Sequence, residues 1–179
     1  MIVFAFALIV ILIAADQLLK YAVVKGIELG EVISIIKIGD KRVLELTHIR
    51  NTGAAWSIMQ GKSWFLIGLP VVVLILGSAF LIYKRNSLKK LEVISIAMII
   101  AGGIGNLIDR IRLKEVVDFI SFKLINFPIF NFADICVVVG EILLVVYIFF
   151  FDKDEAKVKQ KAAGSSEEEE EKTDDKNDE

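Results

Sequence analysis

Four long apolar stretches dominate the sequence and restrict the folds open to it. The first covers roughly residues 2–15 and is extended by Leu18, Leu19 and the residues beyond them. The other three cover roughly residues 64–83, 91–108 and 129–151. A helix crosses a bilayer with about 20 mainly apolar residues. The second and fourth stretches meet this condition almost without charge, and the first and third meet it if their polar residues lie near a membrane surface. Four such stretches argue against a soluble fold, and we expect an all-α polytopic membrane protein.

The charged loops indicate how the four spans are oriented. The first span has no Lys or Arg before Ala15, so it lacks the positive region of a cleaved signal peptide and is expected to be retained. The loop between the second and third spans carries four cations, Lys84, Arg85, Lys89 and Lys90, which is typical of a cytoplasmic loop. Both termini are therefore expected in the cytoplasm, with outer loops at about 21–62 and 109–128.

The first outer loop is long enough to form a small folded element. Residues 43–50 partly alternate apolar and polar side chains, which predicts a strand. We therefore expect a small extracytoplasmic β-containing element in this loop. Residues 1–151 would form one membrane domain. Residues 152–179 carry 12 acids and 6 Lys and predict an acidic, disordered cytoplasmic tail, to which we assign no role.

Most of the unusual polar residues gather at the outer face of this topology. Ordinary interfacial polarity accounts for Lys20, Lys123 and Arg112. It accounts poorly for Asp134, because the apolar helix continues directly after it. Ionisable groups are costly inside a membrane and need partners or a function. One shared site is therefore expected from the remaining polar residues, which are Asp16, Asn51, Asn106, Asp109, Arg110, Asp118, Asn131 and Asp134.

The residue types limit the chemistry of such a site. His48 is the only histidine, so no Ser–His pair and no histidine-rich metal site is expected. Cys136 lacks a histidine base and is expected to be a small packing residue. Two carboxylates, Asp118 and Asp134, remain. A close pair that shares one proton could activate water and hydrogen-bond a substrate carbonyl, as in aspartic peptidases. Spacing alone leaves structural ion pairs as an equally good interpretation.

Five short motifs occur in an order that resembles a known family. They are Asp16-Gln17-Leu18-Leu19-Lys20, Asn51-Thr52-Gly53-Ala54-Ala55-Trp56, Gly102-Gly103-Ile104-Gly105-Asn106-Leu107-Ile108-Asp109-Arg110, Val116-Val117-Asp118-Phe119 and Phe130-Asn131-Phe132-Ala133-Asp134. Together they resemble lipoprotein signal peptidase (signal peptidase II), a family of bacterial inner-membrane aspartic endopeptidases. The resemblance covers about residues 1–151. Trp56 departs from it, since the family usually has Phe there.

The resemblance implies a substrate, a site and a location. The substrate would be a diacylglyceryl-modified prolipoprotein, cut just before its lipidated cysteine, with Asp118 and Asp134 as the catalytic residues. Lys20 and Asp109 would give structural support. No metal, cofactor or nucleic acid is expected, and the partners would be the substrate and membrane lipid, with the chain acting as a monomer in the bacterial cytoplasmic membrane. Site-shaping or substrate-binding roles fall to Asp16, Asn51, Gly105, Asn106, Arg110 and Asn131.

Two non-enzymatic functions are alternatives. A small transporter or ion- or proton-conducting protein could use Asp134 and Glu141, which lie on roughly the same face of the fourth span. Such a protein would place polar groups through the full membrane depth, whereas here only Glu141 lies deep. A structural assembly factor is the other alternative, and it would need no paired aspartates.

Overall fold

The computed structural model describes residues 1–53, 63–125 and 127–152. The motif residues Ala54, Ala55 and Trp56 and the tail after Asp152 lie outside the described residues. A π-helical turn, Ile148–Asp152, continues the last helix. In chain order the elements are α1 (Ile2–Gly26), β1 (Val32–Ile38), β2 (Lys41–Asn51), α2 (Ser63–Tyr83), α3 (Lys90–Leu113), β3 (Val116–Phe122) and α4 (Phe132–Tyr147).

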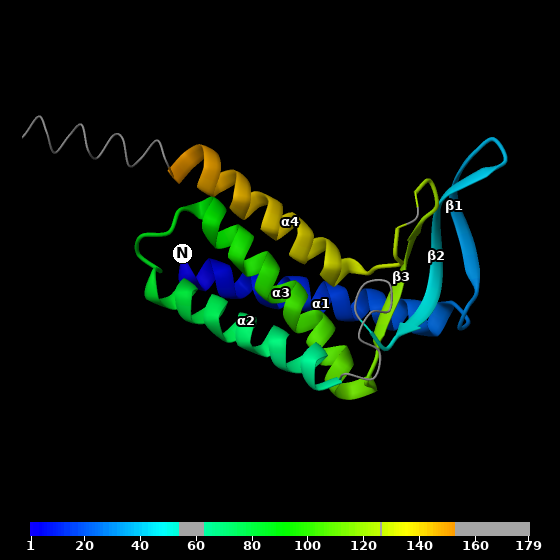
Figure 1. Ribbon diagram of the computed structural model, residues 1–179, viewed down its shortest axis with the longest axis horizontal. Helices are drawn as coiled ribbons and strands as arrows, with labels where there is room; N and C mark the ends of the chain where they lie inside the picture. Colours follow the sequence, from blue (N-terminus) through cyan, green and yellow to red (C-terminus); the bar gives the residue numbers. More distant parts are fainter. Residues whose placement is uncertain (54–62, 126, 153–179) are drawn as a thin grey trace, which may run out of the picture.

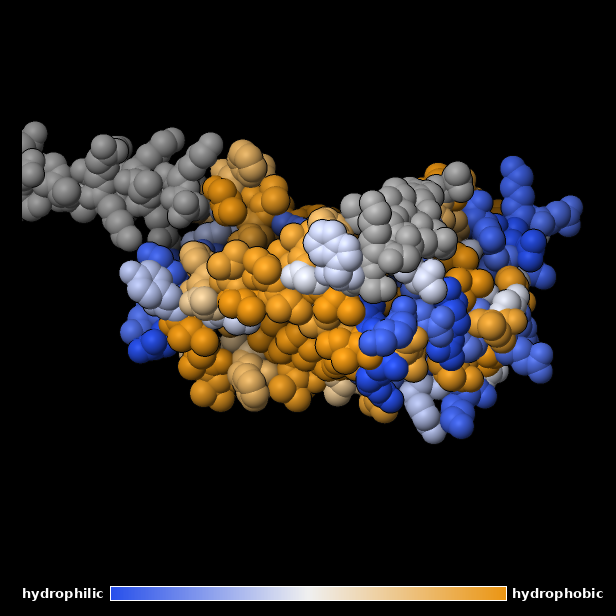
Figure 2. Space-filling view, turned by 60° about the horizontal axis from the view of Figure 1, so that its bottom comes forward, coloured by the Kyte–Doolittle hydropathy of each residue, from blue (hydrophilic) through white to orange (hydrophobic). Residues whose placement is uncertain are grey.

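The four helices confirm the expected membrane fold. Each is long and apolar enough to cross a bilayer. α3 is the central helix, because it contacts the other three and 44% of its most apolar window is buried, against 6–17% for the others. Hydrophobic side chains cover the middle of the bundle between hydrophilic ends (Figure 2). The apolar outer surface is therefore the expected lipid contact, and polar side chains are concentrated at the two ends.

A three-stranded antiparallel sheet caps one end of the bundle. Its order is β1-β2-β3, and β2 confirms the strand expected at 43–50. The third strand was not expected, because residues 109–128 were predicted to be a loop. β3 is buried along nearly its whole length and lacks the alternation that marks a half-buried strand. The predicted loop boundaries also differ, since α1 continues to Gly26 and α3 to Leu113.

Packing against α1 fixes the sheet on the bundle. Val23 and Ile27 at the end of α1 form a buried cluster with Val117 and Phe119 of β3. The N-terminus and the end of α4 lie at the opposite end of the bundle (Figure 1). As a result, β3, the end of α3 and the start of α4 meet at the sheet end.

Two local signals bring the chain into this arrangement. α3 ends at Leu113, and the left-handed conformation (φ 65°) of the C-cap residue Lys114 turns the chain into β3. α4 begins with a capping box, in which the Asn131 side chain accepts from the Asp134 backbone and the Asp134 side chain accepts from the Asn131 backbone. The capping box therefore also fixes the Asp134 carboxylate at the sheet end of α4.

Glycines on α3 allow close approach of its neighbours. A Cβ at Gly105 would lie 2.6 Å from Asp16 Oδ2, and a Cβ at Gly102 would overlap the Ala133 carbonyl of α4. A Cβ at Gly103 would meet only the end of the flexible Leu74 side chain, at 2.9 Å. Gly105 and Gly102 are therefore required by contacts that cannot easily move, whereas Gly103 is not.

We expect Gly105→Ala to destabilise the protein by about 1–3 kcal/mol, because the added methyl group overpacks against the buried Asp16 carboxylate. Gly103→Ala is the matched control, since Leu74 can change rotamer and alanine improves helix propensity. Thermal unfolding of the two purified variants in the same detergent measures the difference. Equal melting temperatures for Gly105→Ala and Gly103→Ala would contradict this view of α3.

Candidate active site

A cavity of about 550 Å³ lies at the sheet end, bounded by the sheet, α3, α4 and the segment before α4. Most of its lining is apolar, including Phe127, Ile129 and Val138. The polar side chains of the lining converge from four elements, β2, α3, β3 and α4. They are Asn51, Asn106, Arg110, Asp118 and Asp134.

Asp118 projects from β3 and is only 4% exposed. Its Oδ2 accepts a hydrogen bond from Asn51 Nδ2 at 2.9 Å, and its Oδ1 accepts one from Asn131 Nδ2 at 2.8 Å. Burial is the main cause that raises the pKa of Asp118 to about 6, and the charge of Asp134 adds to it. The two amide hydrogen bonds oppose this shift. Asp118 is thus a carboxyl group that keeps its proton to a higher pH than an ordinary aspartate does.

Asp134 lies in the first turn of α4, where the helix dipole favours a negative charge. Its Oδ1 accepts a hydrogen bond from Asn106 Nδ2 at 2.7 Å, and its Oδ2 accepts one from the Asn131 backbone N–H at 3.0 Å. Asn131 therefore donates to both carboxylates, with its side chain to Asp118 and its backbone to Asp134. The two carboxylates are held in one hydrogen-bonded unit.

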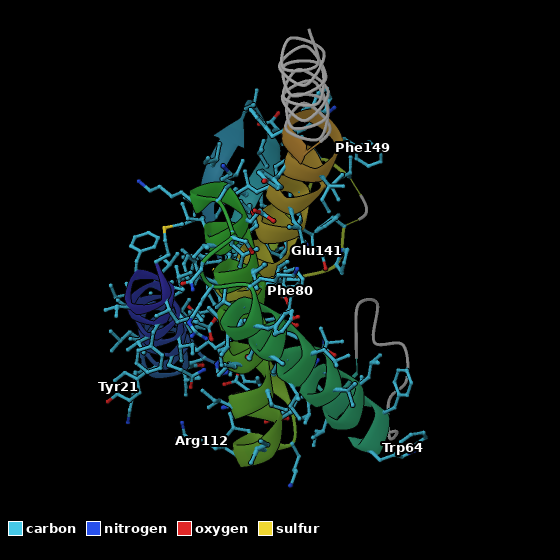
Figure 3. All side chains as sticks on the ribbon, turned by 90° about the vertical axis from the view of Figure 1, so that its left-hand side faces the viewer. Tyr21, Trp64, Phe80, Arg112, Glu141 and Phe149 are labelled. Carbon is cyan, nitrogen blue, oxygen red and sulfur yellow. The ribbon has the colours of Figure 1, made fainter. Side chains whose placement is uncertain are left out.

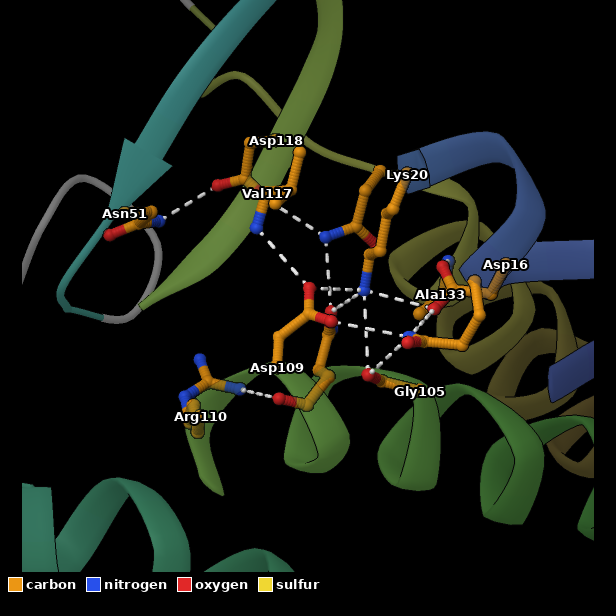
Figure 4. Close-up of polar contacts among 12 residues, drawn as sticks. Asp16, Lys20, Asn51, Gly105, Asp109, Arg110, Val117, Asp118 and Ala133 are labelled. Carbon is orange, nitrogen blue, oxygen red and sulfur yellow. Dashed lines mark hydrogen bonds and ion pairs between the residues drawn. The ribbon is translucent and has the colours of Figure 1, made fainter. Parts of the chain in front are cut away.

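A buried lysine stands behind this unit (Figure 4). Lys20 Nζ lies 2.9 Å from Asp16 Oδ2 and 3.0 Å from Asp109 Oδ2, and it donates to Asn106 Oδ1 at 3.0 Å. Lys20 is 3% exposed, so the interpretation of Lys20 as ordinary interfacial polarity was wrong. The apolar spacing of α1 gave no sign that this lysine would face α3. Its pairing with Asp109 agrees with the structural support expected of both residues.

The two aspartates paired with Lys20 also bind backbone of the neighbouring elements. Asp16 Oδ1 accepts from the Ala133 N–H of α4 at 3.0 Å, and Asp109 Oδ2 accepts from the Val117 N–H of β3 at 3.3 Å. Gln17 adds hydrogen bonds to both aspartates and was not singled out in the sequence, although it follows Asp16 in the first motif. The network therefore joins α1, α3, α4 and β3.

Arg110 supplies a second cation on the cavity side. Its guanidinium donates to the Asn106 and Gly53 carbonyls, both at 3.4 Å, and its charge acts on Asp134 and Asp118. No group of three His, Cys, Asp or Glu suited to a metal ion occurs within the described part of the chain. The two cations that interact with the site carboxylates are Lys20, which pairs with Asp16 and Asp109, and Arg110, whose charge acts on Asp134 and Asp118.

The structure brings all ten site residues expected from the sequence to the sheet end. Five line the cavity, Asn131 bridges the two carboxylates, and the other four, Asp16, Lys20, Gly105 and Asp109, lie behind them. Paired carboxylates of this kind can take a proton from water and give one to a carbonyl group. The fold and the site thus define a polytopic membrane protein with a paired-carboxylate centre.

Comparison with known proteins identifies the family. The family model described as signal peptidase (SPase) II matches residues 8–150. The chain is 43% identical over 139 residues to the lipoprotein signal peptidase of Lactiplantibacillus plantarum (78% of this chain, 89% of the relative). It is 42% identical over 138 residues to that of Bacillus subtilis (76% and 86%). The chain therefore belongs to the signal peptidase II family and is a peptidase.

Solved structures share the fold. One, described as a bacterial membrane enzyme structure obtained by the in meso method at 2.3 Å resolution, superposes with a TM-score of 0.75 at 32% identity. The match covers 83% of this chain and 88% of that one. A second, at 1.9 Å resolution, gives a TM-score of 0.74 at 31% identity over 84% and 96%. The four helices with their small sheet are therefore a fold already seen in bacterial membrane enzymes.

The environment of Asp118 predicts its titration. A pKa raised to about 6 means that the group is protonated below pH 6 and loses its proton as the pH rises through 6. The infrared carboxyl signal that Asp118→Asn abolishes should therefore fade near pH 6. Asn51→Ala removes a hydrogen bond that favours the ionised form, so the same signal should persist to higher pH. Lys37→Gln on β1, an exposed position, is the control and should titrate as the wild type does. Titration near 3.8, the ordinary value, would contradict the burial argument.

Proposed function

We propose that the chain removes signal peptides from diacylglyceryl-modified prolipoproteins, with Asp118 and Asp134 as the catalytic pair. The observation that carries the proposal is the joining of both carboxylates through Asn131 at the wall of one cavity. The names of the relatives, lipoprotein signal peptidase, support the substrate class. The apolar lining of the cavity suits a lipid-modified peptide.

The environments of the two carboxylates support separate roles. Asp134, at the positive end of the α4 dipole, takes a proton from a water molecule that attacks the carbonyl carbon of the peptide bond. Asp118, the protonated partner, gives its proton to the carbonyl oxygen. In the collapse of the tetrahedral intermediate, one hydroxyl group returns its proton to Asp118, the C–N bond breaks, and Asp134 gives the proton it took from water to the leaving amine. The products are the signal peptide with a free carboxylate and the lipidated cysteine with a free amino group.

The arrangement of charges supports an orientation in the membrane. The loop with Lys84, Arg85, Lys89 and Lys90 lies at the end of the bundle opposite the sheet, and cationic loops favour the cytoplasmic side. The termini would then be cytoplasmic and the cavity extracytoplasmic, where a diacylated cysteine would lie. One chain supplies every residue of the proposed site, which agrees with a monomer as the working unit.

Transport through Asp134 and Glu141 is not favoured. The family match indicates a peptidase. Asp134 is held by Asn106 and Asn131 in the site, whereas Glu141 lies exposed on α4. The deep carboxylate is therefore not joined to the site by any polar path within the described residues.

We expect Asp118→Asn and Asp134→Asn each to reduce prolipoprotein cleavage by at least about a hundredfold, because the shared chemistry needs both groups. The double variant should be no worse than either single one, since the two residues act as a unit. Turnover of a synthetic diacylglyceryl prolipoprotein by purified enzyme is the measurement. Asp40→Asn is the matched control, because Asp40 is an exposed carboxylate in the β1–β2 turn, and it should cleave at the wild-type rate.

The Asp109→Asn variant distinguishes a residue that supports the fold from one that takes part in the cleavage reaction. Asp109 contacts Lys20 and the Val117 backbone and does not line the cavity, so its loss should lower the melting temperature as well as the activity. Normal turnover by Asp118→Asn or by Asp134→Asn would refute the catalytic assignment.

A further inference from the structure

One wall of the site cavity is a face of α4 that continues toward the opposite end of the bundle. Asp134, Ile135 and Val138 are among the residues of α4 that line the cavity. Beyond it, Ile142 is 56% exposed and Val145 is 52% exposed. A chain that lies in the cavity and runs on into the membrane along α4 would therefore meet exposed side chains of this helix.

Glu141 lies on this path, between the site cavity and a second hollow. The second hollow, of about 330 Å³, is formed by α2, α3 and α4 and includes Phe80, Leu144 and Ile148 in its lining. Leu144 and Ile148 follow Glu141 by one and two helical turns and so share its side of α4. Figure 3 shows Glu141 and Phe80 on the side of the molecule away from Tyr21 of α1.

The carboxyl group of Glu141 has no hydrogen bond or ion pair within residues 1–53, 63–125 and 127–152, and it is exposed. Its neighbours one turn away on α4 are Val137, Val138 and Val145, which are apolar. Lipid chains offer no hydrogen-bond donor or acceptor, so an unpartnered polar group at this depth favours any partner that brings one.

We propose that Glu141 is a specificity-determining residue that hydrogen-bonds a Ser or Thr side chain in the signal-peptide helix of the substrate. This inference rests on the proposed function, because it takes the substrate to be a membrane-spanning signal peptide. The occupant of the α4 face follows from continuity with the site. A peptide bond held at Asp134 leaves its N-terminal portion to run along α4 toward the cytoplasmic end.

The geometry fixes which part of the signal peptide meets Glu141. Glu141 follows Asp134 by seven residues, which corresponds to about 10 Å along the α4 axis. A substrate helix has the same rise per residue and runs in the opposite direction. The residue opposite Glu141 is therefore about seven residues before the cleaved bond.

The test uses purified full-length enzyme in lipid nanodiscs and synthetic diacylglyceryl prolipoproteins with an all-leucine apolar segment. One leucine at a time, from about four to about ten residues before the cleaved bond, is replaced by Ser or by Ala. We expect the Ser/Ala ratio of kcat/KM to reach about three- to tenfold near the seventh position, the effect of one hydrogen bond. In Glu141→Leu the ratio should fall to about one, while Glu141→Gln should retain part of it. Val145→Leu, on the same exposed face, should keep the full ratio.

A second measurement tests the contact itself. Glu141→Cys, combined with Cys136→Ala and Asp118→Asn, should form a disulfide with substrates that carry one cysteine in the segment. We expect cross-linking to be strongest near the seventh position and to weaken about one helical turn away on either side.

The outcomes separate this inference from the function on which it rests. Cleavage of every substrate with a flat Ser/Ala ratio, or cross-linking without a positional maximum, would overturn the role of Glu141 and leave the proposed function standing. Failure of the wild-type enzyme to cleave any diacylglyceryl substrate would overturn both.

Discussion

The buried ammonium group of Lys20 is the interaction on which the site depends. It pairs with Asp16 from its own helix and with Asp109 from α3, and it donates to Asn106, which in turn holds Asp134. Through the same aspartates the network binds the backbone of α4 and of β3. Four elements, α1, α3, β3 and α4, are therefore joined through the contacts of one cation. Removing one partner from a buried cluster of this kind costs about 3–5 kcal/mol, since it leaves an uncompensated charge.

This cluster distinguishes the sheet end of the bundle, which is rich in polar contacts, from the mostly apolar packing of the rest. The hydrogen-bonding groups of a polar cluster in a membrane protein must find their partners within the protein. Here side-chain amides and backbone N–H groups donate hydrogen bonds to the carboxylates in addition to those from the cations. Gly105 admits the Asp16 carboxylate against α3, and the capping box of α4 sets Asp134. The same contacts that build the fold at this end also hold the two carboxylates that we propose to be catalytic.

Much of the fold could be predicted from the sequence. The length of an apolar stretch indicates a membrane span, and a strand with one buried face alternates apolar and polar residues. The four helices and the strand at 43–50 followed from these rules. β3 did not, since its burial on both faces hides the alternation. The site residues could be predicted from the order of their motifs along four spans. The burial of Lys20 could not, because its partner Asp109 belongs to α3 and the sequence does not show that α1 and α3 are in contact. The Asn131–Asp134 capping pattern was a readable signal for the start of α4.

The central claim is that Asp118 and Asp134 act together on one peptide bond. The most direct measurement is a structure of the Asp118→Asn enzyme with an uncleaved diacylglyceryl prolipoprotein peptide. We expect the carbonyl group of the bond before the lipidated cysteine to lie between position 118 and Asp134, within about 3 Å of both side chains or of a water molecule that they hold. A bound peptide whose cleavable bond lies away from these two side chains would contradict it.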